Sequence, residues 1–242
     1  MQIPAPQPAR YAQMENRMKN CIVLPNQTTR RILPSACATA LAVAFMVSLS
    51  QPAIAGQVIP PIVPTDDIQV PAGNVAFLVG HALGTQNYVC KPSGSGVAYV
   101  LFTPEATLFN DDDGQIITHF FSPNPDPDDT NTSPTVVADG AIRATWVHSR
   151  DNSSVWAKVH QPIGAANVDK DAIDWLLLDV VGAEPGLTGG GMLTKTTFVH
   201  RVNTTGGRAP STGCASPTDI GNQAFVPYTA DYFFYFNPKA DQ

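Results

Sequence analysis

The sequence has no apolar run of membrane-spanning length and no paired-thiol motif. Its longest apolar stretch, residues 38–49, is rich in Ala, Ser and Thr, whereas a helix needs about 20 predominantly apolar residues to cross a bilayer. We therefore expect no transmembrane anchor. None of the four cysteines stands in a Cys-x-x-Cys pair, which argues against a reactive dithiol.

The N-terminal region instead has the three parts of a secretory signal. Residues 1–31 carry five basic residues and one acidic residue, the apolar stretch follows, and Ala53-Ile54-Ala55 is a small-x-small cleavage site. We expect cleavage of the extension and signal at residues 1–55, a secreted or periplasmic protein, and no stable membrane insertion afterwards. The long basic region leaves a later start codon open, and its paired arginines leave twin-arginine export open beside the general secretory route.

Basic residues are scarce once this leader is removed. The whole chain has 14 basic and 20 acidic residues, so residues 56–242 keep 9 basic and 19 acidic residues, a formal net charge of −10. Such an acidic surface repels phosphate backbones, and we expect no nucleic-acid partner. Cys90 and Cys214 are the two cysteines that remain, and an isolated pair in an oxidising compartment usually forms a disulfide.

Helical periodicity is missing as well. Apart from a turn or two near residues 165–172, no window has an apolar 3.6-residue period of helical length. Short runs of alternating apolar residues are instead separated by turn residues such as Asp113-Gly114 and Asp139-Gly140. The sequence predicts an all-β fold, a single-domain antiparallel β-sandwich or barrel with long loops, over residues 74–242, after an extended lead-in at residues 56–73.

The expected strands are short, and one of them is aromatic throughout. Residues 232–236 read Tyr-Phe-Phe-Tyr-Phe, which suits a strand buried on both faces. A surface loop is expected at residues 122–133, which are rich in Pro, Asp and Asn. The expected strands lie near residues 75–79, 86–91, 97–101, 106–109, 115–121, 135–137, 141–148, 155–160, 175–181, 194–202 and 231–236.

Motifs for cofactors, metals and nucleophilic catalysis are also missing. The acidic run Asp111-Asp112-Asp113-Gly114 lacks the ligand spacing of a calcium-binding EF-hand. The glycine-rich residues 180–191 precede a strand-like run rather than the helix that a dinucleotide-binding loop needs, so we do not expect an NAD-dependent dehydrogenase. No Gly-x-Ser-x-Gly elbow occurs, and no two histidines stand at metal-ligand spacing on a helix. We expect no cofactor and no metal site.

Two polar side chains occupy apolar strands. His119 shares a strand face with Ile117 and Phe121, and the simplest expectation is a core histidine bonded to the backbone. Arg201 shares a face with Val199 and Asn203. A guanidinium beside an apolar neighbour either reaches solvent or meets an anion. The expected anion is one of the chain's many aspartates, and the alternative is a ligand carboxylate.

Several segments together resemble a family of exported bacterial and fungal proteins known only as a domain of unknown function. The resemblance spans residues 74–236, and it implies that the Cys90–Cys214 bridge is shared. Some fungal members carry a malate dehydrogenase label, and no catalytic residues are established for the family. The segments that carry the resemblance are Gly84-Thr85-Gln86-Asn87-Tyr88-Val89-Cys90, Pro104-Glu105-Ala106-Thr107-Leu108-Phe109, Thr118-His119-Phe120, Asp174-Trp175-Leu176-Leu177-Leu178, Arg201-Val202-Asn203-Thr204-Thr205-Gly206-Gly207 with Gly213-Cys214, and Val226-Pro227-Tyr228-Thr229-Ala230-Asp231-Tyr232.

These observations favour a non-enzymatic extracytoplasmic binding protein for a small molecule, a glycan or a surface partner. The candidate ligand-binding residues are Gln86, Tyr88, His119 and Arg201. The alternative is a small hydrolase or isomerase that uses His119 with Arg201. We favour binding because no nucleophile, metal cluster or cofactor loop is evident. The deciding observation is whether His119, Arg201 and Gln86 share a concave pocket.

Overall fold

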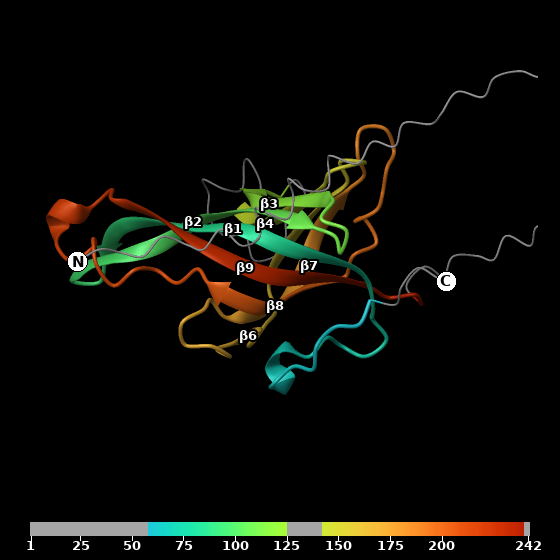
Figure 1. Ribbon diagram of the computed structural model, residues 1–242, viewed down its shortest axis with the longest axis horizontal. Helices are drawn as coiled ribbons and strands as arrows, with labels where there is room; N and C mark the ends of the chain where they lie inside the picture. Colours follow the sequence, from blue (N-terminus) through green and yellow to red (C-terminus); the bar gives the residue numbers. More distant parts are fainter. Residues whose placement is uncertain (1–57, 125–141, 240–242) are drawn as a thin grey trace, which may run out of the picture. The chain divides into compact units, whose positions relative to one another are not determined.

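The computed structural model describes residues 58–124 and 142–239 of the chain (Figure 1). The expected signal peptide, its cleavage site and the Asp139-Gly140 turn lie outside these residues. The described part contains strands and two short 3-10 helices, and it includes no helix long and apolar enough to cross a membrane. The expectation of an all-β domain is confirmed. The elements are η1 (Asp66–Ile68), β1 (Val75–Ser93), β2 (Gly96–Phe109), β3 (Gln115–Pro123), β4 (Ile142–His148), β5 (Ser154–Val159), β6 (Ala165–Ala166), β7 (Trp175–Glu184), β8 (Phe198–Gly206), η2 (Pro217–Asp219) and β9 (Gln223–Phe236).

The strands form one antiparallel sheet that closes on itself. Neighbours run in the order β5-β4-β3-β2-β1-β9-β8-β7-β6, and β5 also pairs with β7. This last pairing closes eight strands into a barrel, while the two-residue β6 lies beside the start of β7. Of the two architectures expected from the sequence, the barrel is therefore the one that forms. The helical turn considered near residues 165–172 is wrong, because these residues form β6 and a turn.

Two strands are longer than the sequence suggested. Residues 75–79 and 86–91 belong to the single strand β1, and residues 97–101 and 106–109 belong to β2. Gly84 does not interrupt β1, because its missing side chain permits close contact with β2: a Cβ there would lie 2.6 Å from the Cα of Ala106. Pro104 is accommodated in β2 beside a bulge that leaves Phe102 without a partner in β1.

The barrel wall is packed on both sides along β9. Tyr232 and Phe234 face the interior core, whereas Phe233 and Tyr235 pack outside the wall with Val202 and with residues of the lead-in. All four aromatic side chains are buried, as the aromatic run predicts. The interior core is built around the fully buried side chains of Leu108, Ile117, Trp146, Val155, Val199 and Phe234.

A disulfide ties the first strand to the loop between β8 and β9. Cys90 and Cys214 are bonded, and their Cα atoms lie 5.5 Å apart, within the usual range for an unstrained bridge. The predicted pairing is confirmed. Such a bond is typical of proteins that work in oxidising compartments.

Candidate ligand-binding site

The barrel forms a partly open cavity of about 600 Å³. Each of the eight barrel strands contributes to its lining, and so do two loop segments, one before β7 and one after β8. Much of the lining is apolar, with Leu101, Phe121, Leu176 and Leu178 among the contributors. A cavity of this size suits a small organic molecule.

All four candidate residues line this one cavity. Gln86 and Tyr88 come from β1, His119 from β3 and Arg201 from β8. They reach the same space because side chains of one strand alternate between the two faces of a sheet, and each of these four is on the inner face. Strands that are far apart in sequence therefore bring Gln86, His119 and Arg201 together in one concave pocket.

His119 is held between aromatic rings. Its imidazole is stacked on Trp146, with centroids 4.4 Å apart and an interplanar angle of 7°, and it lies 5.1 Å from the ring of Tyr232. Its Nδ1 lies 2.8 Å from the carbonyl oxygen of Thr145. A carbonyl can only accept, so Nδ1 carries the proton and Nε2 is an acceptor. Burial, with a smaller contribution from the charge of Arg201, lowers the pKa of His119 to about 3.

Arg201 is oriented by the backbone of Asp174. Its Nε and Nη2 donate hydrogen bonds of 3.1 and 2.8 Å to the Asp174 carbonyl oxygen. The sequence favoured an aspartate as its partner, and the structure gives the main-chain oxygen of one rather than its carboxylate. Among the described residues, no carboxylate forms an ion pair with Arg201. Its positive charge is therefore positioned without being neutralised.

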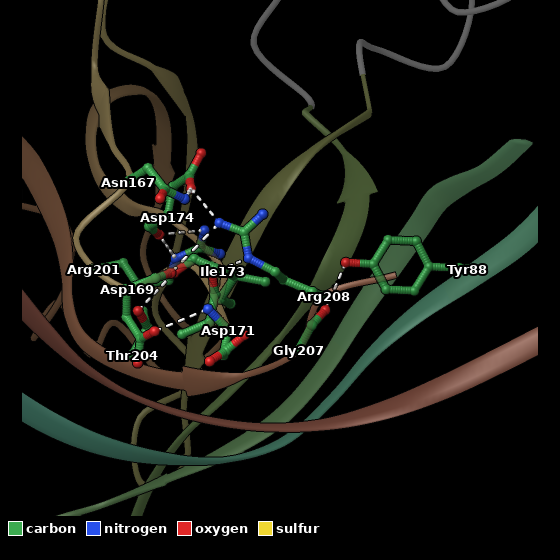
Figure 2. Close-up of polar contacts among 11 residues, drawn as sticks. Tyr88, Asn167, Asp169, Asp171, Ile173, Asp174, Arg201, Thr204, Gly207 and Arg208 are labelled. Atoms are coloured by element: carbon green, nitrogen blue, oxygen red, sulfur yellow. Dashed lines mark hydrogen bonds and ion pairs between the residues drawn. The ribbon is translucent and has the colours of Figure 1, made fainter. Parts of the chain in front are cut away.

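Arg208, which sequence reasoning missed, lies beside Arg201 (Figure 2). Its Nε donates a 2.6 Å hydrogen bond to the carbonyl oxygen of Ala172, and its Nη2 lies 3.5 Å from a carboxylate oxygen of Asp174. Arg208 follows the Gly206-Gly207 turn after β8, where no strand alternation marks which way a side chain points. The sequence marks Arg208 only weakly, as a basic residue directly after the family segment that ends at Gly207.

Together the two arginines and a threonine hold residues 169–174, the loop before β7, against β8. Thr204 donates a 2.6 Å hydrogen bond to the carbonyl oxygen of Ile173. The three consecutive carbonyls of residues 172–174 thus receive hydrogen bonds from Arg208, Thr204 and Arg201 respectively. Figure 2 shows these side chains around the loop, with their hydrogen bonds as dashed lines. These hydrogen bonds join the loop and the two arginines into one unit, which we call the loop unit.

Tyr88, from β1, also supports this unit. Its hydroxyl donates a 2.6 Å hydrogen bond to the carbonyl oxygen of Gly207, next to Arg208 (Figure 2). Burial raises the pKa of Tyr88, although the charges of Arg201 and Arg208 partly offset that effect. Tyr88 therefore lines the cavity mainly as a residue that positions the Arg208 segment.

Two buried donors in the cavity wall have no partner in the part of the chain that the structure describes. Gln86 is 2% exposed, and its amide nitrogen has no hydrogen-bond partner. Burial raises the pKa of the neighbouring Tyr228, and Gln86 only slightly offsets that effect. Trp146 is 0% exposed, and its indole nitrogen also has no partner. A buried donor left without a partner costs about 1–3 kcal/mol. Such groups are expected where a ligand supplies the missing acceptors.

Among the described residues, the charged side chains of the lining are mostly positive. Arg143, Lys158, Arg201 and Arg208 line the cavity there, together with the acid Asp174. This local balance is opposite in sign to that of residues 56–242 as a whole, which carry ten more acidic than basic groups. A cation in a partly enclosed, low-dielectric space attracts an anion more strongly than one on the open surface.

The other motifs weighed in the sequence have structural roles. The acidic run Asp111-Asp112-Asp113-Gly114 forms the turn between β2 and β3, where Asn110 Oδ1 accepts a 2.7 Å hydrogen bond from the Gly114 amide. Residues 180–184 are the end of β7 and lead into a turn rather than a helix. In residues 58–124 and 142–239, no group of three or more His, Cys, Asp or Glu side chains is placed to hold a metal ion.

Comparison with known proteins assigns a family and no activity. No curated protein and no solved structure is significantly similar to the chain. A family model described as "Protein of unknown function (DUF3455)" matches residues 71–236. This match covers the whole barrel, all four candidate residues and both cysteines of the disulfide. The chain therefore belongs to the DUF3455 family of proteins of unknown function.

Proposed function

We propose that this protein binds a small molecule in the barrel cavity without transforming it. The observation that carries the proposal is the partly open cavity of about 600 Å³, lined by apolar side chains and a few converging polar groups. This combination is the usual character of a small-molecule site. A cavity of this volume suits a small ligand better than a glycan chain or a protein surface.

The state of His119 favours binding over the alternative of a hydrolase or isomerase. A general base works best when its pKa lies near the working pH, whereas burial lowers the pKa of His119 to about 3. Within the described part of the chain, no serine, threonine or cysteine side chain is hydrogen-bonded to its Nε2. His119 is thus suited to accept a hydrogen bond from a bound molecule and poorly suited to take its proton.

We further propose that binding takes place outside the cytoplasm. The disulfide supports an oxidising compartment, and the leader supports export. Intact-mass measurement on protein from the extracytoplasmic fraction tests this proposal. The expected mass is that of a chain beginning at or near Gly56, and a product that retains residues 32–50 and sediments with membranes would contradict it.

Blocking the cavity tests the proposed binding. Ala209 is exposed and lines the cavity, so Ala209→Trp should obstruct it without disturbing the core. Ala215→Trp is the matched control, because Ala215 is exposed in the same β8–β9 connection but does not line the cavity. A panel of small apolar acids and their neutral amides is screened by ligand-observed NMR. Binding that is lost in Ala209→Trp and kept in Ala215→Trp is expected; no binding by any compound, or equal binding to both variants, would refute the proposal.

A further inference from the structure

The polar groups of the cavity are almost all hydrogen-bond donors. Arg201 uses Nε and Nη2 on Asp174, and its Nη1 makes no hydrogen bond to any described residue. Within residues 58–124 and 142–239, the amide nitrogen of Gln86 and the indole nitrogen of Trp146 also have no partner. A guanidinium, a carboxamide and an indole together can donate several hydrogen bonds. A ligand that satisfies them must present acceptor oxygens.

These donors lie along one connected path of side chains. Arg201 is the cross-strand neighbour of Tyr232, whose hydroxyl lies 3.2 Å from that of Tyr228. Gln86 is close to Tyr228, and Trp146 lies 5.7 Å from Tyr232 between ring centroids. Gln86, Trp146 and Arg201 thus surround the same two tyrosines.

The positive charge of the site indicates which acceptor group the ligand carries. Arg201 has no carboxylate partner among the described residues, so a neutral ligand would leave a partly buried cation uncompensated. A carboxylate compensates one positive charge and offers two oxygens with about four acceptor positions. A phosphate dianion would bring more charge and more hydration than these donors and the apolar wall of Leu101, Phe121, Leu176 and Leu178 can replace.

Resting on the proposed binding function, we propose that the cavity is specific for small carboxylates with an apolar body. The carboxylate is bound by Arg201, with Gln86 or Trp146 as a second donor, and the body packs against the apolar lining. The bond to the Asp174 carbonyl holds the guanidinium in place before the ligand arrives, which reduces the entropy lost on binding. Arg208 adds positive potential from the same loop unit.

The experiment compares charged and neutral ligands of the same shape. Wild-type protein at neutral pH is titrated calorimetrically with apolar acids of four to ten carbons, including 4-phenylbutyrate, and with their amides. Each acid is expected to bind at least tenfold more tightly than its amide. Arg201→Gln should remove this preference by weakening the acid at least tenfold, while the amide changes less than twofold. Arg150→Gln, at an exposed turn arginine outside the cavity lining, should change neither.

The outcomes separate this inference from the proposed function. Equal binding of acids and amides, or tighter binding of 4-phenylbutylphosphonate than of the carboxylate, would overturn the carboxylate specificity and leave the cavity as a binding site. No binding by any acid or amide would overturn both. A second variant, Gln86→Met, guards against a folding defect in Arg201→Gln. It should weaken the acid at least threefold with no loss of melting temperature, and unchanged affinity in both variants would contradict the assignment.

Discussion

The imidazole of His119 lies flat against the indole of Trp146, with ring centroids 4.4 Å apart and planes inclined by 7°. The hydrogen bond from Nδ1 to the Thr145 carbonyl fixes the ring's rotation as well as its tautomer. The ring therefore presents a lone pair at Nε2 and no positive charge. Its environment sets it apart from His81, which is partly exposed and lies between two carboxylates, at 2.7 Å from Asp231 and 2.9 Å from Asp111.

The pKa values of the two histidines should be shifted in opposite directions from that of an ordinary histidine. Burial lowers the pKa of His119 to about 3, whereas the hydrogen bond to Asp231, assisted by Asp111 and opposed by partial burial, raises the pKa of His81. NMR should show the His119 ring signals unchanged between about pH 8 and 5, while those of His81 titrate above the ordinary value of about 6.5. Titration of His119 near 6.5 would contradict the burial argument.

The same shift makes stability depend on pH. Because the folded-state pKa of His119 is depressed, its neutral form is fully favourable above the unfolded pKa, and this stabilisation is lost as the pH falls toward 3. His200, with a pKa lowered to about 4 by burial, contributes in the same direction. Between about pH 4 and 6, His119→Phe should reduce the slope of unfolding free energy by about 1.4 kcal/mol per pH unit. Urea denaturation at several pH values measures it, and an unchanged slope would show that His119 is protonated in the folded state.

Removing the unpaired amide of Gln86 should not destabilise the protein. Met has a similar length and volume but needs no hydrogen-bond partner, so Gln86→Met removes the cost of a buried unpaired donor. We expect the free energy of unfolding to rise by about 1 kcal/mol, at the low end of that cost. The control is Gln115→Met at an exposed position, which should change stability by less than about 0.5 kcal/mol. A clear loss of stability in Gln86→Met alone would mean that the amide has a partner after all.

Gly207 should resist substitution because of its neighbours as well as its backbone. Gly207 and Gly189 have nearly the same positive φ, 81° and 82°. A Cβ at Gly207 would lie 2.9 Å from the Cβ of Tyr228 and 3.0 Å from the Cγ2 of Ile173, whereas one at Gly189 would meet nothing within 4 Å. Gly189→Ala should cost about 1–2 kcal/mol for the left-handed conformation alone. Gly207→Ala should cost about 1–3 kcal/mol more because of overpacking. Chemical denaturation compares the two, and equal losses would show that the cavity wall yields freely.

The disulfide should supply a large share of the stability. Cys90 and Cys214 are separated by 124 residues, and closing a loop of that length in the unfolded chain is worth about 4–5 kcal/mol in the chain-entropy account. The double variant Cys90→Ala/Cys214→Ala should therefore melt far below the wild type, and reduction of the wild type should have the same effect. Two free thiols in unreduced, denatured protein would show that the bond is absent.

Strand alternation predicted the faces of side chains better than it predicted the strand boundaries. Apolar alternation placed His119 and Arg201 on definite faces, and both reach the cavity. Local sequence misplaced the ends of β1 because Gly84 resembles a turn residue, whereas its actual role is to permit close contact with Ala106. Strand periodicity could not predict the orientation of Arg208, because this residue lies beyond the end of β8. The pairing of β5 with β7 is also invisible locally, since it depends on how the whole sheet curves.

The number of cysteines was enough to predict the disulfide, because the two cysteines of the domain can pair in only one way. Ligand chemistry needed the structure. The fold determines that Arg201 donates to the main-chain oxygen of Asp174. It also leaves Gln86 and Trp146 with donors that have no partner among the described residues. Residue types and spacing alone could not distinguish an aspartate of the chain from an external anion.

The barrel's first strand is also the partner of its last. β1 and β9 pair along nearly their whole length, from Val75 with Phe236 to Val89 with Gln223. During synthesis, β1 cannot pair with β9 until the C-terminal end of the domain has been made. The barrel wall cannot close before then. Contacts so distant in sequence slow folding. A nascent chain of this topology therefore stays open until it is nearly complete.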